Sequence, residues 1–138
     1  MNQLSDFPLI TYDKIRYGDT DRQGHVNNAV FSSFLETGRV EILYNNSLTL
    51  LSQDASFVIA SLKLDFLNEI NWPGKVDIGT GILRIGNSSI VIFQMLYQHT
   101  TCVASAETVI VQVHNVKKAS VPLSESAKET LGRWLMDK

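Results

Sequence analysis

Two different spacings of apolar residues divide the chain into a helical segment and several strands. Residues 8–17 mix β-forming residues with charges and predict a first strand. From residue 27 to about residue 45 the apolar positions recur every three or four residues, which is the period of one helix face. This apolar stripe consists of Phe31, Phe34, Leu35, Gly38 and Ile42. The pattern predicts a long amphipathic helix shortly after the first strand.

The start and the middle of this helix each carry a recognisable feature. Asn27 or Asn28 can cap the start, because an asparagine side-chain oxygen accepts a hydrogen bond from a first-turn amide. A glycine inside a helix costs about 1 kcal/mol relative to alanine. Gly38 therefore predicts a close approach of the helix to another element.

Residues 56–113 predict a run of β-strands separated by short turns. The first of them alternates in polarity, and its more apolar face carries Val58, Ala60, Leu62, Leu64 and Phe66. A Pro-Gly turn precedes the second, whose apolar face carries Val76, Ile78 and Ile82. The turn Gly86 to Ser89 leads into the third, and residues 102–113 form the last long strand.

The strand that begins at Ile90 is apolar on both of its faces. Ile90, Ile92 and Leu96 alternate there with Val91, Phe93, Met95 and Tyr97. A strand of this kind needs cover on both faces. The long helix can cover one face, and we expect a second copy of the chain to cover the other.

A short helix over residues 124–137, with Ser124 as its cap, is predicted at the end of the sequence. The order is then one strand, a long helix and about four antiparallel strands. This is an α+β arrangement, with one helix laid across a curved antiparallel sheet. Residues 1–138 show no repeat or internal linker and are expected to form a single domain.

Composition and charge narrow the classes of protein. A chain of 138 residues with 44% apolar residues can form the core of one ordinary domain. Its net charge of -2 argues against nucleic acid as the main partner. The one cysteine, Cys102, cannot form an internal disulfide, and neither a signal-peptide pattern nor a membrane-length apolar run is present. We expect a cytoplasmic protein without a membrane partner.

Polar, turn-forming residues crowd the segment "RYGDTDRQGHVNNAVF" between the first strand and the helix. Taken singly, each has a structural explanation: Asp19 and Asp21 as turn residues, and Asn27 and Asn28 as caps. His25 has no partner at a metal-ligand spacing, so no metal site is predicted.

The arrangement of these residues suggests chemistry as well. A carboxylate a few residues before a helix start can sit beside the free amides of the first turn, which carry partial positive charge. Those amides can hold a developing oxyanion, while the carboxylate attacks a carbonyl or activates water. This is a minimal set of groups for acyl transfer.

The segment "YGDTDRQGHVNNAVFSSFLETGR" resembles the signature of the hotdog-fold acyl-CoA thioesterases of the 4-hydroxybenzoyl-CoA thioesterase type. Shared features are the Asp-x-Asp pair, the Gly-His-Val-Asn-Asn run and a helix that carries a Glu and an Arg. The strand pairs downstream are similar too, so the resemblance covers about residues 11–113. It implies an antiparallel sheet wrapped around a central helix, assembled as a homodimer or homotetramer.

The resemblance also implies a function and a set of site residues. Asp21 takes the position of the catalytic carboxylate, Asp19 has the structural role, and the amide that polarises the thioester carbonyl lies near Asn28. His25 and Glu36 are further candidate catalytic residues. The candidate substrate-binding residues are Asn27, Phe31, Ser88 and Ser89. The substrate is an acyl-CoA, so coenzyme A enters as part of the substrate and no cofactor is implied.

Several points stay open from the sequence. Glu36 can orient water at the site, or it can form a surface pair with Arg39 three residues later. The turn Gly86 to Ser89 lacks the basic residue with which some relatives bind a CoA phosphate; Lys117 and Lys118 are alternatives, or simply a solvated strand exit. Asp21 can act as nucleophile or as general base.

Two alternative functions fit the same fold. The first is hydrolysis of acyl-carrier-protein thioesters, which would favour a basic rim around the pocket, whereas this chain is net acidic. The second is a non-catalytic acyl-thioester-binding protein, because one fold hosts many functions. We expect an acyl-CoA thioester hydrolase.

Overall fold

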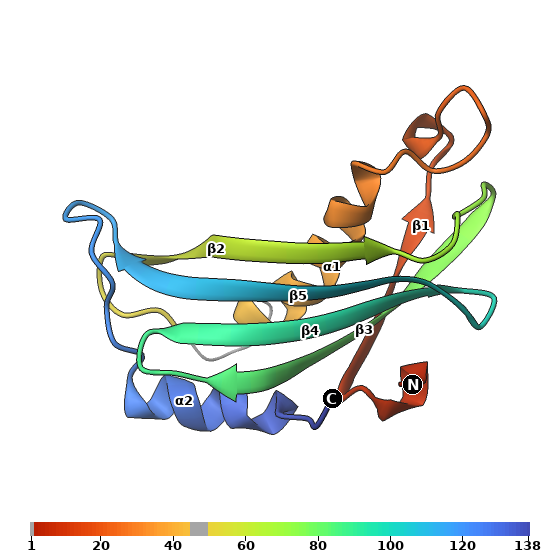
Figure 1. Cartoon of the computed structure of the whole chain (residues 1–138). Coiled ribbons are helices and arrows are strands. Elements are labelled where there is room, and N and C mark those ends of the chain that lie inside the picture. Colours follow the sequence, from red (N-terminus) through yellow and green to blue (C-terminus); the bar gives the residue numbers. More distant parts are fainter. Residues whose placement is uncertain (1, 45–49) are drawn as a thin grey trace.

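The computed structural model describes residues 2–44 and 50–138 as an antiparallel five-stranded sheet with a long helix behind it (Figure 1). The strands are β1 (Leu9–Ile15), β2 (Ala55–Phe66), β3 (Gly74–Ile85), β4 (Ser89–Gln98) and β5 (Thr101–His114). Their order across the sheet is β1-β3-β4-β5-β2, so β1 and β2 are the two edges. The predicted order of one strand, a helix and four strands is confirmed.

The long helix α1 (Val30–Leu43) packs mainly against β1, β3 and β4. Its predicted apolar stripe is buried against the sheet, as are Val76, Ile78 and Ile82 on β3. The close approach predicted at Gly38 is confirmed: a Cβ there would lie 2.5 Å from Thr80 Oγ1 and 2.6 Å from Gln94 Nε2. The helix therefore rests on the sheet at this glycine.

The start of α1 differs from the sequence prediction. The cap position is Ala29, which makes no side-chain cap, and neither asparagine occupies it. A turn comes first, because the Val30 N–H donates to the Asn27 carbonyl at 2.9 Å. The Asn27 side chain still acts locally: its Oδ1 accepts from the Ala29 N–H at 3.0 Å. The predicted helix end near residue 45 lies outside the described residues.

The face assignment for β2 needs a correction. The register between β2 and β5 shifts between Ile59 and Ser61, which marks a bulge. Because a bulge adds one residue, the alternation reverses across it. Ile59 pairs with Ile110, and Leu62 pairs with Thr108 on the same inner face of β5. Ile59 therefore shares the α1 side of the sheet with Leu62, and Val58 does not.

The second apolar face of β4 is covered by the chain itself, and the prediction of a second copy there was wrong. Phe93, Met95 and Tyr97 are buried with Phe7, beside Leu4 and Met136. The Tyr97 hydroxyl also donates to the Asn2 carbonyl at 3.0 Å. Both chain ends thus pack on the face away from α1, and Figure 1 shows them near each other.

The C-terminal helix α2 (Glu125–Leu131) is shorter than predicted and continues as a 3₁₀ turn, Gly132–Trp134. Its predicted cap is confirmed, since the Ser124 side chain accepts from the Ala127 N–H at 3.0 Å. After the turn the backbone joins the sheet, and the Met136 N–H donates to the Ile82 carbonyl at 2.9 Å. None of the helices within residues 2–44 and 50–138 is long and apolar enough to cross a membrane.

Candidate active site

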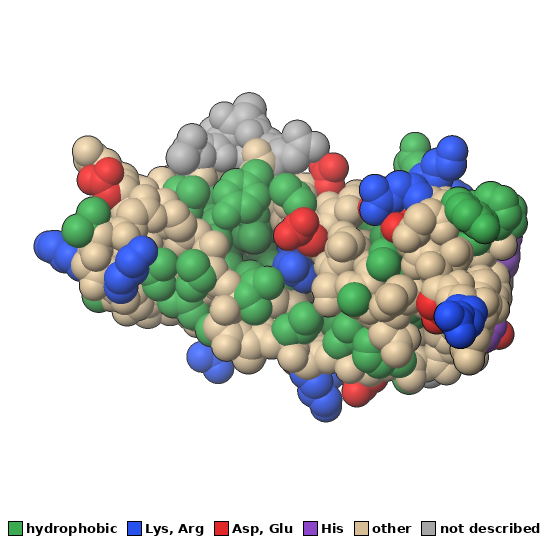
Figure 2. All heavy atoms as spheres, turned by 90° about the horizontal axis from the view of Figure 1, so that it is seen from above, with side chains coloured by type: hydrophobic (Ala, Val, Ile, Leu, Met, Phe, Trp, Pro, Cys, Tyr) green, Lys and Arg blue, Asp and Glu red, His purple; other side chains and the backbone are tan. Residues whose placement is uncertain are grey.

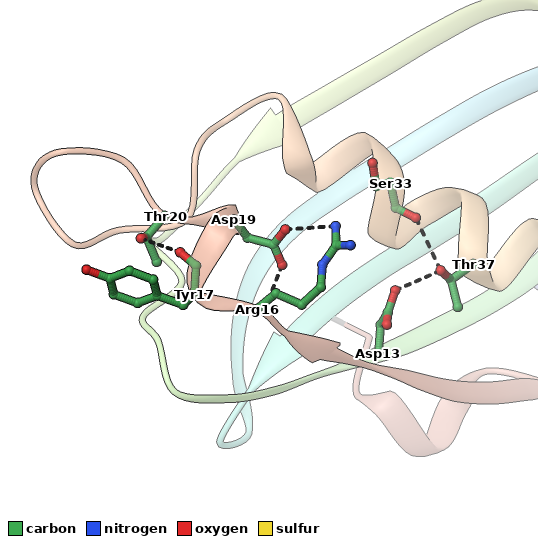
Figure 3. Close-up of polar contacts among 7 residues, drawn as sticks. All are labelled: Asp13, Arg16, Tyr17, Asp19, Thr20, Ser33 and Thr37. Atoms are coloured by element: carbon green, nitrogen blue, oxygen red, sulfur yellow. Dashed lines mark hydrogen bonds and ion pairs between the residues drawn. The ribbon is translucent and has the colours of Figure 1, made fainter.

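Asp19 anchors the loop between β1 and α1 (Figure 3). The residue is only 3% exposed. The carboxylate accepts from the Arg16 backbone N–H at 2.8 Å and pairs with the Arg16 guanidinium at 3.0 Å. The Asp19 carbonyl accepts from the Asn27 N–H at 2.8 Å. Asp19 therefore fixes both ends of the loop, in agreement with the structural role expected for it.

Asp21 closes the tip of the same loop but remains exposed. Its Oδ1 accepts from the backbone N–H groups of Gln23 at 2.9 Å and His25 at 3.3 Å. Its own N–H donates to the His25 carbonyl at 2.8 Å. Oδ2 accepts no hydrogen bond from the residues that the structure describes. One oxygen thus holds the turn, and the other is available to water or substrate.

His25 lies between the loop and the segment that follows β2. Its Nε2 is 2.7 Å from Glu69 Oε2, and its backbone bridges to Asn71. The neighbouring Val26 N–H donates to the Ile70 carbonyl at 2.8 Å. These contacts tie the loop to residues 69–71. The Glu69 carboxylate can orient the imidazole by accepting a hydrogen bond from its Nε2–H.

The backbone just before α1 offers an unpaired donor. The Ala29 N–H is taken by Asn27, and the Phe31 N–H donates to the Asn28 carbonyl at 3.3 Å. The Asn28 N–H has no acceptor among the described residues. It lies at the positive end of the α1 dipole, where an anion is stabilised.

A cleft of about 330 Å³ brings most of the predicted site residues together. It is lined by Asp21, Gln23, His25, Val26, Asn28, Phe31, Phe66, Leu67, Asn68 and Glu69. Phe31 forms its apolar side, with its ring edge-on to that of Phe66 at 5.0 Å between centroids. Carboxylates, an imidazole, a free amide and an apolar wall therefore meet at the start of α1.

Three of the predicted residues do not line this cleft. Glu36 lies two turns further along α1 and is exposed. Ser88 and Ser89 lie at the β3–β4 turn, which is the opposite end of the sheet from the loop. Within one chain these serines therefore cannot contact a molecule bound next to Asp21.

Glu69, Leu67 and Asn68 were not among the predicted site residues. They follow β2 in "FLNEIN", a stretch with no periodic or turn signature that singles them out. Their place in the cleft depends on the antiparallel pairing of distant segments. The contacts of His25 with Glu69 and Asn71, and of Val26 with Ile70, bring the two parts of the chain together.

The fold and the cleft define a class of protein. A five-stranded antiparallel sheet around one long helix, with polar groups gathered at the start of that helix, is a hotdog fold. The family model described as the thioesterase-like superfamily matches residues 15–131, and the chain belongs to this superfamily.

Individual relatives are similar to this chain at low identity. It is 29% identical over 84 residues to the acyl-CoA thioesterase YbgC of Helicobacter pylori, a match that covers 61% of this chain and 63% of that protein. It is 25% identical over 117 residues to the acyl-CoA thioester hydrolase YbgC of Escherichia coli, with 82% and 87% covered.

Solved structures agree on the fold. The PA5185 protein from Pseudomonas aeruginosa superposes with a TM-score of 0.86 at 20% identity, over 98% of this chain and 96% of that one. A thioesterase from Thermus thermophilus, solved in complex with coenzyme A and zinc, gives 0.77 at 26% identity, over 91% and 92%.

Proposed function

We propose that this protein hydrolyses acyl-CoA thioesters to a free acid and coenzyme A. The observation that carries this proposal is one cleft lined by both Asp21 and Asn28, whose N–H has no acceptor among the described residues. Membership of the thioesterase-like superfamily supports it. So do the names of the two YbgC relatives and the coenzyme A bound by the Thermus thermophilus thioesterase.

The chemistry follows from the two groups. The Asn28 N–H donates to the thioester carbonyl and stabilises the oxyanion that forms when the carbon is attacked. Asp21 Oδ2 takes a proton from water as the water oxygen attacks that carbon. The tetrahedral adduct then collapses, the C–S bond breaks, and the departing thiolate receives the proton. In the alternative route Asp21 attacks directly and water hydrolyses the mixed anhydride.

The other cleft residues have supporting parts in this proposal. His25 holds Asp21 through its backbone N–H and is itself oriented by Glu69. Asn27 fixes the turn that exposes the Asn28 amide. Phe31 and Phe66 provide the apolar wall for the acyl group. The catalytic role predicted for Glu36 stays a prediction.

The proposed active form is a homodimer or a larger homo-oligomer built on it. β2 is an edge strand with apolar residues on it, and antiparallel pairing of two β2 strands would place opposite ends of two sheets next to each other. In that arrangement the pantetheine arm runs along the interface. Ser88 and Ser89 of the second copy then come toward the cleft, which one chain alone does not permit.

The test is thiol release from short, long and aromatic acyl-CoAs, including 4-hydroxybenzoyl-CoA, by wild type and by Asp21→Asn. Asparagine keeps the Oδ1 acceptor that holds the turn but removes the base, so turnover should fall about 100-fold or more while acyl-CoA still binds. Asp137→Asn, an exposed aspartate near the C-terminus, is the matched control and should leave turnover unchanged.

Three outcomes distinguish the alternatives. Near-normal turnover by Asp21→Asn would overturn the assigned role of that carboxylate. Hydrolysis of an acyl group only when it is attached to acyl carrier protein would change the substrate class. Binding of acyl-CoA without turnover on either carrier would indicate a non-catalytic acyl-thioester-binding protein.

A further inference from the structure

Arg39 is a buried charge on α1 that the proposed mechanism does not use. Its side chain is only 6% exposed, and its Nη1 has no hydrogen-bond partner within residues 2–44 and 50–138. Burial lowers the pKa of Arg39, and the nearby carboxylate of Glu36 raises it in part. A guanidinium is a donor only, so a buried N–H without an acceptor is costly. A shift of the guanidinium toward the surface would let an acceptor from outside the chain remove that cost.

The direction in which Arg39 points follows from helix geometry. Thr37 donates to Asp13 of the edge strand β1 at 2.9 Å (Figure 3). Each helical residue turns about 100° around the axis, so Arg39 lies about 200° from Thr37. It therefore faces the opposite edge of the sheet, where β2 lies. Glu36 is about 60° from Arg39 on the same flank.

Glu36 and Arg39 do not satisfy each other within the chain. Glu36 is exposed, and the ion pairs found among the described residues do not include these two side chains. Two opposite charges thus lie side by side on one flank of α1. Glu36 is exposed to a group on a second molecule, and Arg39 lies just beneath the same surface.

An apolar strip lies next to these charges, on the side of β2 that is turned toward α1. It consists of Ile59, Leu62 and Phe66, which are 50%, 38% and 50% exposed. α1 rests mainly on β1, β3 and β4 and, apart from the contact of Phe31 with Phe66, leaves the strip exposed. The view from above onto this edge shows hydrophobic side chains gathered around a hollow that holds an acidic and a basic group (Figure 2).

The aromatic contacts between α1 and β2 fix their relative direction. Phe31 contacts Phe66 at 5.0 Å near one end, and Tyr44 contacts Phe57 at 6.1 Å near the other. The helix and the strand therefore run antiparallel. A two-fold axis at the middle of β2 would pair two β2 strands and set two α1 helices antiparallel on one side of the joined sheet.

The two-fold axis would lie close to the midpoints of the two α1 helices. Halfway between Phe31 and Tyr44 lies the segment between Glu36 and Arg39. In an antiparallel pair of helices related by a two-fold axis at this level, position 36 of one helix faces position 39 of the other. The arrangement is isologous, so the contact occurs twice.

We propose that Arg39 and Glu36 join two copies of this chain by two reciprocal ion pairs across the two-fold axis of a β2-to-β2 dimer. Each Arg39 guanidinium then donates to the partner subunit's Glu36, and the apolar strips cover each other on either side. This inference rests on the dimeric form of the proposed thioesterase. It assigns Glu36 to assembly and not to the reaction.

Charge reversal with mixing tests the pairing. Glu36→Arg would place arginine opposite arginine, and Arg39→Glu would place glutamate opposite glutamate, so each variant alone should dimerise at least ~10-fold more weakly than wild type. An equimolar mixture restores both ion pairs in a heterodimer. Native mass spectrometry, which separates the two masses, should show mainly the mixed dimer. An ion pair within one chain would give no such rescue.

Control variants show whether a weaker dimer results from the loss of the ion pairs. Glu129→Arg, on the exposed side of α2, should dimerise like wild type. If Arg39→Glu does not fold by circular dichroism, Arg39→Met and Glu36→Gln replace the reversal pair, and each should weaken the dimer. Unchanged dimers in these variants, or reversed variants that do not recover on mixing, would overturn the proposal.

The activity readout separates this proposal from the thioesterase assignment. A wild-type chain that is monomeric yet hydrolyses acyl-CoA would overturn the dimer while leaving the reaction in place. A dimer that responds to the variants as expected but has no turnover would support the ion pairs and overturn the proposed thioesterase activity. A dimeric Arg39→Glu that loses turnover only on acyl groups ending in a carboxylate would assign Arg39 to the substrate.

Discussion

At the scale of single residues, two aspartates two positions apart have opposite surroundings. Asp19 is buried, and both of its oxygens accept hydrogen bonds from Arg16. Asp21 is exposed and keeps Oδ2 without a donor among the described residues. A carboxylate whose oxygens are both engaged holds structure, whereas one with a free oxygen facing a cleft can react. This difference supports the assignment of Asp21 in the proposed mechanism.

Removal of the Asp19 side chain should destabilise the fold. Asp19→Ala leaves the Arg16 N–H without its acceptor, which should lower the free energy of unfolding by about 2 kcal/mol. Denaturant unfolding of the two proteins measures the difference. Asp21→Asn, which keeps the local acceptor, serves as the comparison and should unfold like wild type. Equal stability of Asp19→Ala and wild type would contradict the anchoring role.

Tyr97 makes stability depend on pH at the alkaline end. Burial, together with smaller contributions from Cys102 and Asp6 nearby, raises the pKa of Tyr97 to about 12. Between the ordinary tyrosine pKa of about 10 and this value, the unfolded chain loses the proton and the folded chain keeps it, so stability falls as pH rises. Tyr97→Phe should lose less stability than wild type between pH 10 and 12 in parallel denaturant titrations.

At the scale of elements, periodic segments were predictable and their exceptions were not. The three- and four-residue period of α1 and the alternation of β3 depend only on local residues, and both were found as predicted. The β2 bulge depends on how two strands align over their length, which no local pattern records. The residues that cover the second face of β4 were not predicted for a similar reason, since Phe7 and Met136 come from opposite ends of the chain.

Gly38 gives a prediction in which packing outweighs helix propensity. Gly38→Ala gains about 1 kcal/mol of helix propensity. The added Cβ, however, would meet Thr80 Oγ1 at 2.5 Å and Ile78 Cγ2 at 2.8 Å, so we expect a net loss of roughly 1–3 kcal/mol. Gly132→Ala is the matched control, because a Cβ there meets nothing within 4 Å. Thermal unfolding that shows Gly38→Ala at or above wild type would disprove the close contact.

At the scale of the whole molecule, the site combines a local motif with distant partners. The loop from Asp19 to Asn28 could be located from its residues alone, because its turns and the helix start are set within a few positions. Glu69 joins it only through the fold of the chain, so no local pattern predicts its contact with His25. Ser88 and Ser89 lie at the far end of the same sheet. Their predicted role therefore requires a second copy.

The proposed dependence of turnover on assembly can be tested with a charge in the apolar strip of β2. Leu62→Arg would place an unpaired charge inside a β2-to-β2 interface and should weaken the dimer roughly 100-fold. Ile10→Arg, at an exposed apolar residue on the opposite edge strand β1, is the matched control. Sedimentation and acyl-CoA turnover are measured over the same range of protein concentrations. Because the proposed dimer is what would bring Ser88 and Ser89 to the cleft, turnover per chain should fall together with the dimer in Leu62→Arg and stay constant in Ile10→Arg. Full turnover by a monomeric Leu62→Arg would mean that one chain holds the complete site.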